Sequence, residues 1–448
     1  MKVAFVVHQY PPRYNTGTEI YAHRMAVTLR QRGHDVRVFA HEPDVRSDAL
    51  LKVHDDSVDE VPVRRLTVFE GLSPNHALHD FYDVFVGKIF GEWLDRTRPD
   101  VVHVFHLMGL GLSLVEEAAA RGIPVFVQLM DFWFLCPTVQ LLRRDGSLCS
   151  GPDTPVCVDC LAPDNYGYQA LRMFSKRDGF VESSAPDPSF TDLNHADVGL
   201  RRAALHGRAD FIRGVLDQAT ALVAPSRFLK GMFLSHGYRD QHMLHVPYGV
   251  DPAMGEVRPL PVNGEGTVTF GFFGSVNPQK GLEVLVSAFR QYRNDAFRLV
   301  VHGNMTHFPK YAKRVRAFAD IDARITFRGP YGHDALADAL SSIDVLVVPS
   351  VWYENTPFVV LEAFSAGRPV VASDLGGLSE IVRDGHNGRT FRAGDPGALM
   401  NVLRDFHEDP GLLARLAGGI ERVRTLEENA QDFVRCWESV LTPAGAGA

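Results

Sequence analysis

Short apolar runs alternate with longer amphipathic stretches along the first half of the chain. The apolar runs predict buried strands at 2–7, 35–41, 100–105, 124–130 and 221–225. Helical spacing of apolar residues predicts helices at about 19–31, 111–120 and 226–236. Strands and helices in alternation are typical of a doubly wound parallel sheet.

The second half repeats this alternation after a stretch rich in proline and glycine at 247–266. Its apolar runs predict strands at 267–273, 298–302, 325–327, 343–349 and 369–373. We therefore expect an α/β protein with a first domain at 1–250, a second at 251–425 and a terminal segment at 426–448. A helix at about 427–441 can pack back on the first domain.

Composition narrows the classes of protein. The 448 residues are 45% hydrophobic and 22% charged, which is usual for a globular protein of two domains. A net charge of −8 without a basic stripe argues against nucleic-acid binding. The sequence has no apolar run of about 18 residues for a membrane span and no signal-peptide pattern at its start, so we expect a cytoplasmic protein. Peripheral membrane contact and the oligomeric state stay open.

Two glutamates, Glu354 and Glu362, flank a predicted strand-to-helix turn. The strand ends near Pro349, and Thr356 and Pro357 suit the N-cap and first position of a helix. Open α/β sheets bind ligands at such strand ends, and free backbone N–H groups at a helix start bind phosphate. One carboxylate can then hold sugar hydroxyls and the other a ribose, which predicts a nucleotide-sugar. The alternative is a plain βαβ unit with two surface acids.

Two more loops are candidate phosphate sites. One contains Gly274 and ends at Lys280, where a lysine at a helix start is unfavourable unless an anion is present. The other precedes the first helix and contains Gly17. An exposed loop lysine and a simple helix cap are the respective alternatives. If two Rossmann-like domains face each other, all three loops open into one cleft.

The combined motifs resemble glycosyltransferase family 4, the retaining nucleotide-sugar transferases of GT-B fold, over nearly the whole chain. The resemblance rests on Glu-x7-Glu at 354–362, Lys-Gly at 280–281, VPYGVD at 246–251, YPPRYNTGTE near the start with a later RGHDVRV, and the phrases at 376–380 and 384–388. It implies a GT-B fold, that is, two facing Rossmann-like domains with a cleft between them.

The resemblance also implies roles. Glu362 would bind the ribose, Glu354 the donor sugar, and Lys280 the leaving diphosphate, with retention of configuration and no catalytic metal. The implied catalytic residues are Glu354, Lys280 and Asp131. The implied nucleotide-sugar site comprises Gly17, Gly274, Ser275, Lys280, Gly329, Tyr331, Glu354, Asn355, Thr356, Phe358, Val359 and Glu362. The donor would be a nucleoside diphosphate sugar, and the acceptor a glycan, a lipid-linked saccharide or a small molecule.

Two positions depart from the family pattern. Ser275 stands where many members have an arginine, and Met130 stands where many have a histidine that meets the donor sugar. His106 or Gln128 can substitute on the acceptor side. These departures keep a non-catalytic partner of another transferase as an alternative. A phosphorylase or an epimerase on the same fold is a further one.

Four cysteines gather in a segment that follows a strand of the first domain. Cys136, Cys149, Cys157 and Cys160 lie in an insertion at about 136–200. In a cytosolic chain such clustering favours a metal, so we expect structural zinc, with an iron–sulfur cluster or four free thiols as alternatives. The polar stretch 165–195 that follows predicts a loop over the acceptor groove.

Overall fold

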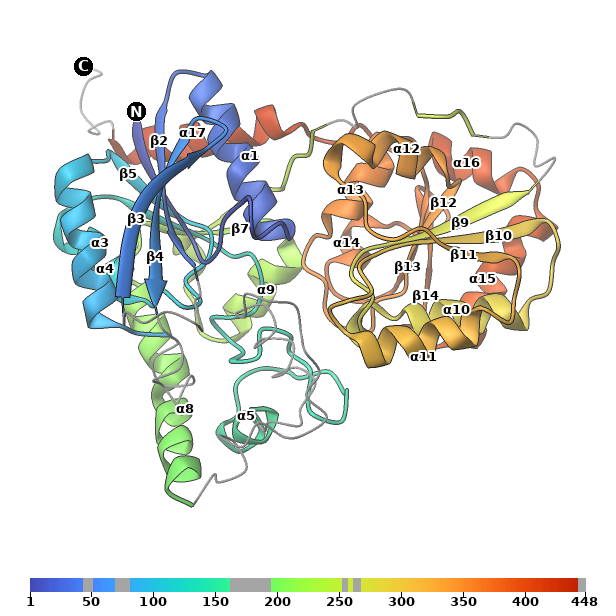
Figure 1. Ribbon diagram of the computed structural model, residues 1–448, viewed down its shortest axis with the longest axis horizontal. Coiled ribbons are helices and arrows are strands. Elements are labelled where there is room, and N and C mark those ends of the chain that lie inside the picture. The colour runs from blue at the N-terminus through green and yellow to red at the C-terminus, as the bar shows by residue number, and fades with distance from the viewer. Residues whose placement is uncertain (43–50, 69–80, 162–194, 252–256, 261–266, 442–448) are drawn as a thin grey trace. The chain divides into compact units, whose positions relative to one another are not determined.

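The computed structural model, shown in Figure 1, describes residues 1–42, 51–68, 81–161, 195–251, 257–260 and 267–441, with the backbone alone at 195–201 and 333. The predicted loop at 165–195 lies almost wholly outside these residues. The chain divides into two compact units, which are described separately. Unit 1 comprises Met1–Pro247 and Leu426–Ala448, and unit 2 comprises Tyr248–Thr425.

Unit 1 contains an eight-stranded sheet in the order β3-β4-β2-β1-β5-β6-β7-β8. Its strands are β1 (Lys2–Val7), β2 (Asp35–His41), β3 (Leu51–Val58), β4 (Val61–Val68), β5 (Val101–Val104), β6 (Val125–Gln128), β7 (Ala221–Ala224) and β8 (Met243–His245). All neighbouring strands are parallel except the edge strand β3, which runs antiparallel to β4. Because β1 pairs with both β2 and β5, the strand order reverses there, which is where such sheets bind ligands.

The helices of unit 1 include one from the far end of the chain. They are α1 (Gly17–Gln31), α3 (Val84–Thr97), α4 (Ser113–Ala120), α5 (Thr154–Cys160), α8 (His195–Leu216), α9 (Arg227–Ser235) and α17 (Leu426–Leu441). Helix α17 lies along α1, where the Tyr21 hydroxyl donates to Asn429 Oδ1 at 2.6 Å. Trp437 is fully buried, and its indole N–H donates to His103 Nδ1 at 3.3 Å. The C-terminal helix thus completes the core of unit 1.

Unit 2 contains a six-stranded, fully parallel sheet in the order β11-β10-β9-β12-β13-β14. Its strands are β9 (Val268–Phe273), β10 (Phe297–His302), β11 (Ile325–Phe327), β12 (Val345–Val348), β13 (Val370–Ser373) and β14 (Gly388–Phe391). Its helices are α10 (Leu282–Gln291), α11 (Pro309–Ala319), α12 (Leu336–Ser341), α13 (Phe358–Ser365), α14 (Leu378–Ile381), α15 (Pro396–Glu408) and α16 (Leu412–Gly418). Here the strand order reverses between β9 and β12.

Alternation along the central strands builds two apolar layers in unit 2. Phe270, Leu299 and Val347 point to one face, where they pack against residues of α10, α11, α15 and α16. Val300 and Leu346 point to the other face, where they pack against α12, α13 and α14. Helices therefore cover both faces of the sheet, as a parallel sheet requires, and leave the strand ends for the site (Figure 1).

The predicted strands are found within three residues of their expected ends. One local prediction is wrong: the helix after Glu354 begins at Phe358, with Pro357 as its N-cap, and Thr356 does not cap it. Pro357 has extended backbone geometry, with φ −68° and ψ 123°, so it precedes the helix instead of starting it.

Candidate active site

The loops that follow β9 and β12 lie side by side at the reversal point of the unit 2 sheet. The first loop passes through a 3-10 turn, Pro278–Lys280, whose N-cap Asn277 accepts a hydrogen bond from the Lys280 N–H at 3.0 Å. The second loop is tied to it by a hydrogen bond of 2.9 Å from the Val351 N–H to the Gln279 carbonyl. These contacts place Lys280 opposite the residues that follow β12.

Glu354 is the centre of this arrangement. Its side chain is only 5% exposed, and one oxygen, Oε1, accepts three hydrogen bonds. Lys280 Nζ donates at 2.6 Å, the Ser350 hydroxyl at 2.7 Å and the Trp352 indole N–H at 2.9 Å. The Lys280 ammonium also lies 5.4 Å from the centre of the Trp352 ring, within the range of a cation–π contact. The structure therefore brings together the predicted Lys280 and Glu354, and adds Ser350 and Trp352.

Electrostatics keep this buried carboxylate ionised. Burial by itself would raise the pKa of Glu354, but the charge and hydrogen bond of Lys280, with those of Ser350 and Trp352, outweigh it. The pKa of Glu354 therefore lies below its ordinary value. The site holds a fixed negative charge beside a lysine that is one quarter exposed, at 27%.

Glycines allow the backbone around Glu354 to close tightly. A Cβ on Gly377 would lie 1.4 Å from the Asn355 carbonyl oxygen, and the Gly377 N–H donates to the Glu354 carbonyl at 2.8 Å. A Cβ on Gly281 would lie 1.9 Å from the Pro349 carbonyl oxygen, and its φ of +68° suits glycine. Both contacts fix the loop that carries Glu354 against its neighbours.

Glu362 lies in α13, near the Tyr331 hydroxyl. Burial raises the pKa of Tyr331, and the nearby Glu362 carboxylate raises it further. The Tyr331 ring packs at 5.2 Å from Phe273 and 5.6 Å from His302. Glu362 is half-buried. A carboxylate and the aromatic ring of Tyr331 are therefore neighbours at this edge of the sheet.

The other residues predicted for the nucleotide-sugar site of unit 2 lie in the loops after β9, β11 and β12 and at the start of α13. Gly274 has a φ of +140° at the exit of β9, and its N–H donates to the His302 carbonyl at 3.0 Å. The Gly329 carbonyl accepts from the Gly303 N–H at 3.0 Å. The half-buried members are Ser275, Asn355, Thr356, Phe358 and Val359.

Unit 1 has its own polar cluster where its strand order reverses. His106, just past β5, pairs through Nε2 with Asp131 Oδ2 at 3.0 Å, and its Nδ1 accepts from the Met108 N–H at 3.1 Å. The Trp133 N–H donates to the other oxygen of Asp131 at 2.8 Å. Burial would raise the pKa of Asp131, but His106 and this N–H hold it below its ordinary value. The predicted His106 and Asp131 are thus direct partners.

A second carboxylate–imidazole pair, absent from the sequence prediction, lies against the first. His8, just past β1, is 3.2 Å from Glu19, which also accepts from the Thr16 hydroxyl. The His8 and His106 rings are 4.4 Å apart. Burial and the neighbouring His106 lower the pKa of His8, so its ring stays neutral. His8 was detectable as a polar residue directly after a predicted strand, but its pairing with Glu19 is a tertiary contact.

Three other predicted residues of unit 1 have different surroundings. Gln128 is fully buried in β6, the neighbour of β5 that carries His103. Met130 is half-buried between β6 and Asp131. Gly17 is exposed and is the first residue of α1.

The expected zinc or iron–sulfur site is not supported. Cys136, Cys149, Cys157 and Cys160 are buried free thiols, near enough to influence each other electrostatically. However, no group of three or more His, Cys, Asp or Glu side chains within the described ranges is arranged to hold a metal ion. The sulfurs make local contacts instead: Cys136 with the Thr138 hydroxyl at 3.3 Å and Cys149 with the Gly151 carbonyl at 3.2 Å. Burial raises the pKa of Cys157 to about 11 and that of Cys160 to about 12, which favours neutral thiols.

Family comparisons agree with this division of the chain. Residues 16–249 match the glycosyl transferase 4-like domain, and residues 267–409 match glycosyl transferases group 1. The chain belongs to the glycosyl transferase 4-like family. This confirms the resemblance that the sequence motifs carried.

Two solved structures share the fold of this chain. A sucrose-phosphate synthase from Thermosynechococcus elongatus aligns with a TM-score of 0.64 and 16% identity, over 98% of each chain. The Anabaena protein HepE, solved with UDP and glucose, aligns with a TM-score of 0.63 and 16% identity, over 98% of this chain and 100% of that one. These similarities support a GT-B-like fold of parallel α/β sheets.

Curated relatives of this family member match over shorter segments. A D-inositol 3-phosphate glycosyltransferase of Stackebrandtia nassauensis is 34% identical over 165 residues, which cover 35% of this chain and 37% of the relative. A lipopolysaccharide 1,2-N-acetylglucosaminetransferase of Salmonella typhimurium is 29% identical over 202 residues, covering 42% and 52%. The matched region thus spans about a third to a half of these relatives.

Within the described ranges, no helix is long and apolar enough to cross a membrane.

Proposed function

We propose that the chain transfers a sugar from a nucleoside diphosphate sugar to a hydroxyl group of an acceptor, with retention of configuration. The observation that carries this proposal is the buried, ionised Glu354, held by Lys280, Ser350 and Trp352 where the strand order of unit 2 reverses. Fixed polar groups at such a position suit a ligand with both hydroxyls and negative charge.

Lys280 and Glu354 have different roles at the reacting end of the donor. Lys280 would meet the diphosphate, where negative charge grows as the bond to the sugar breaks. Oε1 of Glu354 accepts all three of these hydrogen bonds, and the other oxygen would accept from donor-sugar hydroxyls. The ion pair orients both groups before the donor binds, so little reorganisation is needed.

The other end of the donor is assigned to the α13 region. Glu362 would accept from the ribose hydroxyls, as in the family motif, with Tyr331 beside it. The N–H groups of Phe358 and Val359, in the first turn of α13, would bind phosphate oxygens. The leaving phosphate would take the acceptor proton in a front-face attack, and Lys280 would supply the charge stabilisation without a catalytic metal.

The acceptor side is assigned to the two carboxylate–imidazole pairs of unit 1. The Nδ1 atom of His106 accepts from the Met108 N–H, so its Nε2 carries the proton that Asp131 accepts. Glu19 likewise accepts from His8 Nε2, which leaves His8 Nδ1 with no hydrogen-bond partner among the described residues. Imidazoles held in this way by carboxylates suit a polar, hydroxyl-bearing acceptor such as a glycan, a lipid-linked saccharide or a small molecule.

Thermal unfolding with added nucleotides tests the proposal. UDP, GDP, ADP, dTDP and their common sugar conjugates are added to the purified protein in turn. A ligand at about 100 times its dissociation constant stabilises the folded state by about 2.7 kcal/mol, which is readily measured. We expect a shift with one base, lost in Glu362→Ala and kept in Glu408→Gln, a control carboxylate whose side chain is 61% exposed. If no nucleotide or conjugate shifts the transition, the proposed donor class is wrong.

The transfer reaction separates an enzyme from a binding protein. The sugar conjugate that stabilises the protein is incubated with it, and release of nucleoside diphosphate is followed. Glu354→Gln keeps the shape of the side chain but removes its charge, so release should fall at least about a hundredfold, as when one stabilising group of a transition state is lost. Unchanged release would exclude Glu354 from catalysis, while binding without release in the wild type would favour a non-catalytic partner.

A further inference from the structure

Unit 2 has a cationic face on an otherwise acidic chain. Residues 281–330 contain nine lysines and arginines but only four aspartates and glutamates, whereas the whole chain carries a net charge of −8. The segment includes α10 and α11, which lie side by side on one face of the sheet (Figure 1). The positive charge is therefore concentrated on neighbouring elements.

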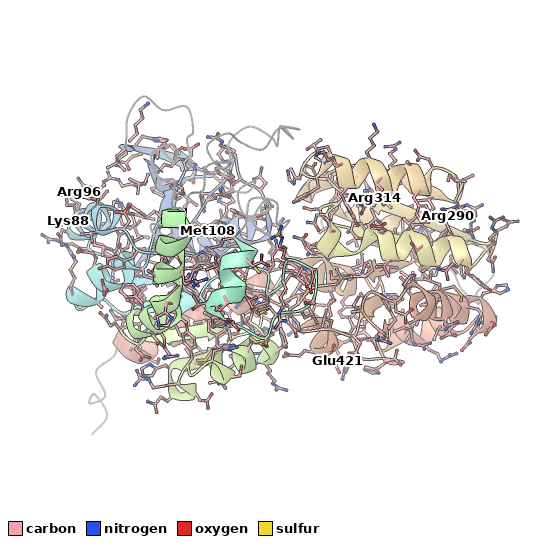
Figure 2. The ribbon with its side chains drawn as sticks, turned by 90° about the horizontal axis from the view of Figure 1, so that it is seen from below. Lys88, Arg96, Met108, Arg290, Arg314 and Glu421 are labelled. Carbon is pink, nitrogen blue, oxygen red and sulfur yellow. The ribbon has the colours of Figure 1, made fainter. Side chains whose placement is uncertain are left out.

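Helix α11 presents much of this charge to solvent. Its exposed residues Lys310, Lys313, Arg314 and Ala317 recur at helical spacing along one side, while Tyr311, Ala312 and Val315 are buried. Arg290 reaches over from α10, and Figure 2 labels it together with Arg314 on this layer. The cations thus line the outer surface of α11, opposite its buried face.

Acidic neighbours offset only part of the charge. Glu283 pairs with Arg314 at 2.9 Å, and Asp320 lies 3.5 Å from Arg316. Both pairs are exposed, where ion pairs contribute little and compete with other partners. The face formed by Lys310, Lys313, Arg314, Arg316 and Arg290 keeps a net positive charge after these two acids are counted.

Two exposed apolar side chains adjoin these cations. Ile321, just past the end of α11, is 73% exposed, and Phe318 is 38% exposed. The guanidinium of Arg290 lies 4.0 Å from the centre of the Phe318 ring, so charge and apolar surface are in direct contact. An anionic bilayer offers partners for both: phosphate groups for the cations and the boundary of the acyl chains for Ile321 and Phe318.

We propose that the cationic face, defined as Lys310, Lys313, Arg314, Arg316, Arg290, Phe318 and Ile321, docks on the surface of an anionic lipid bilayer. Charge complementarity supplies long-range attraction, and the apolar pair favours a bilayer over a nucleic acid. The phosphates of a nucleic acid would bind the cations, but an exposed isoleucine would add nothing to that binding. This docking does not depend on the proposed enzymatic activity.

Co-sedimentation of the full chain with lipid vesicles tests the docking. One vesicle is pure phosphatidylcholine, and the other contains about one third phosphatidylglycerol. The wild type is expected to sediment with the anionic vesicles only, and less so as salt is raised, because salt screens the attraction. Lys313→Glu with Arg314→Glu should weaken binding at least about tenfold. Ile321→Ser should weaken it about threefold or more without changing the charge.

A charge-matched control decides whether this particular face is responsible. Lys88→Glu with Arg96→Glu reverses two exposed cations on α3 of unit 1, both labelled in Figure 2, and should leave vesicle binding unchanged. The inference is overturned if the wild type does not bind anionic vesicles, or if both double variants lose binding equally. It is also overturned if poly(U) RNA binds as tightly as the vesicles and Ile321→Ser affects neither. Urea unfolding of each variant tests whether it is folded. If the variant with Lys313→Glu and Arg314→Glu does not fold, Arg314→Gln takes its place.

Discussion

The ion pair of Glu354 and Lys280 ties stability and function to the same two side chains. A carboxylate that is 5% exposed stays charged only while a compensating charge and hydrogen bonds are present. Removing one member of such a pair costs about 3–5 kcal/mol, because the other charge is left buried and unpaired. A fall in nucleoside diphosphate release in a single variant at either residue therefore has to be compared with the unfolding free energy of the same variant.

A double substitution separates the two effects. Lys280→Met should lower the free energy of unfolding by about 3 kcal/mol, since it leaves the Glu354 carboxylate without its ammonium partner. Adding Glu354→Gln removes the unpaired charge and should restore most of this loss, while nucleoside diphosphate release stays low. Urea unfolding and the release assay are measured on the same preparations. If the double variant is as unstable as Lys280→Met, the pairing does not explain the buried charge.

His103 provides a pH-dependent part of the stability. Burial lowers its pKa to about 3, because the protonated ring would be desolvated beneath α17. The unfolded chain then binds one more proton than the folded one between pH 3 and the usual pKa near 6.5. The contribution of His103 to the free energy of unfolding is fully present above about pH 6.5. It falls by about 1.4 kcal/mol per pH unit as the pH is lowered from there towards pH 3.

Substitution of His103 should flatten this dependence. His103→Gln keeps an acceptor for the Trp437 indole N–H but cannot take up a proton. Between about pH 7 and pH 5 it should lose about 2 kcal/mol less unfolding free energy than the wild type. Urea titrations at the two pH values measure this difference. The control His407→Gln removes an exposed histidine and should lose as much unfolding free energy between the two pH values as the wild type. If His103→Gln loses as much as the wild type, His103 is not the source of the pH dependence.

Among the elements, the loop after β12 depends on a glycine from the next βα connection. Gly377→Ala would place a methyl group 1.4 Å from the Asn355 carbonyl oxygen, so the Glu354–Asn355 backbone must move. We expect a loss of about 2–4 kcal/mol in unfolding free energy and a loss of nucleoside diphosphate release, measured by urea unfolding and by the release assay. Gly214→Ala, in the exposed part of α8 with nothing within 4 Å, should instead stabilise by about 0.5–1 kcal/mol. An unperturbed Gly377→Ala would mean that the loop is not held in place there.

The elements that sequence patterns predicted are those buried in the sheets. Lys2–Val7 and Asp35–His41 were predicted with their observed ends, because the first is an apolar run and the second is rich in β-branched and aromatic residues, each bounded by polar or turn residues. The hairpin of β3 and β4 was missed. Nearly all of β3, LKVHDDSV, is exposed at the sheet edge, and the turn at Asp59 and Glu60 has φ of 46° and 63° without a glycine to mark it.

The candidate site was predictable to the extent that it follows the strand ends. Glu354 and Lys280 were proposed from motifs, Asp131 from the family resemblance, and His106 as a substitute for the family histidine that Met130 replaces. The indole donor of Trp352 and the pairing of His8 with Glu19 depend on side-chain directions that no local pattern encodes. The cysteine spacing suggested a metal, but spacing does not determine whether sulfur atoms converge around one point.

At the scale of the whole molecule, the two units differ in how the chain builds them. Unit 2 is the continuous segment Tyr248–Thr425 and has apolar layers on both faces of its sheet. Unit 1 is assembled from both ends of the chain, because α17 returns to it and buries Phe433 and Trp437. A domain with its own core can fold alone, whereas one that lacks a core helix exposes apolar surface.

Fragments of the chain should therefore behave unequally. Residues 248–425 alone should unfold cooperatively in urea and bind the nucleotide found for the whole protein, because Lys280, Glu354 and Glu362 all lie within them. Residues 1–247 alone should be unstable or aggregate, since losing the fully buried Trp437 by itself costs about 3–5 kcal/mol. Joining 426–448 to 1–247 through a flexible linker should restore cooperative unfolding, and Trp437→Ala should abolish the rescue. A stable fragment 1–247 would show that α17 is dispensable for the core. A fragment 248–425 that folds without binding nucleotide would place part of the donor site outside unit 2.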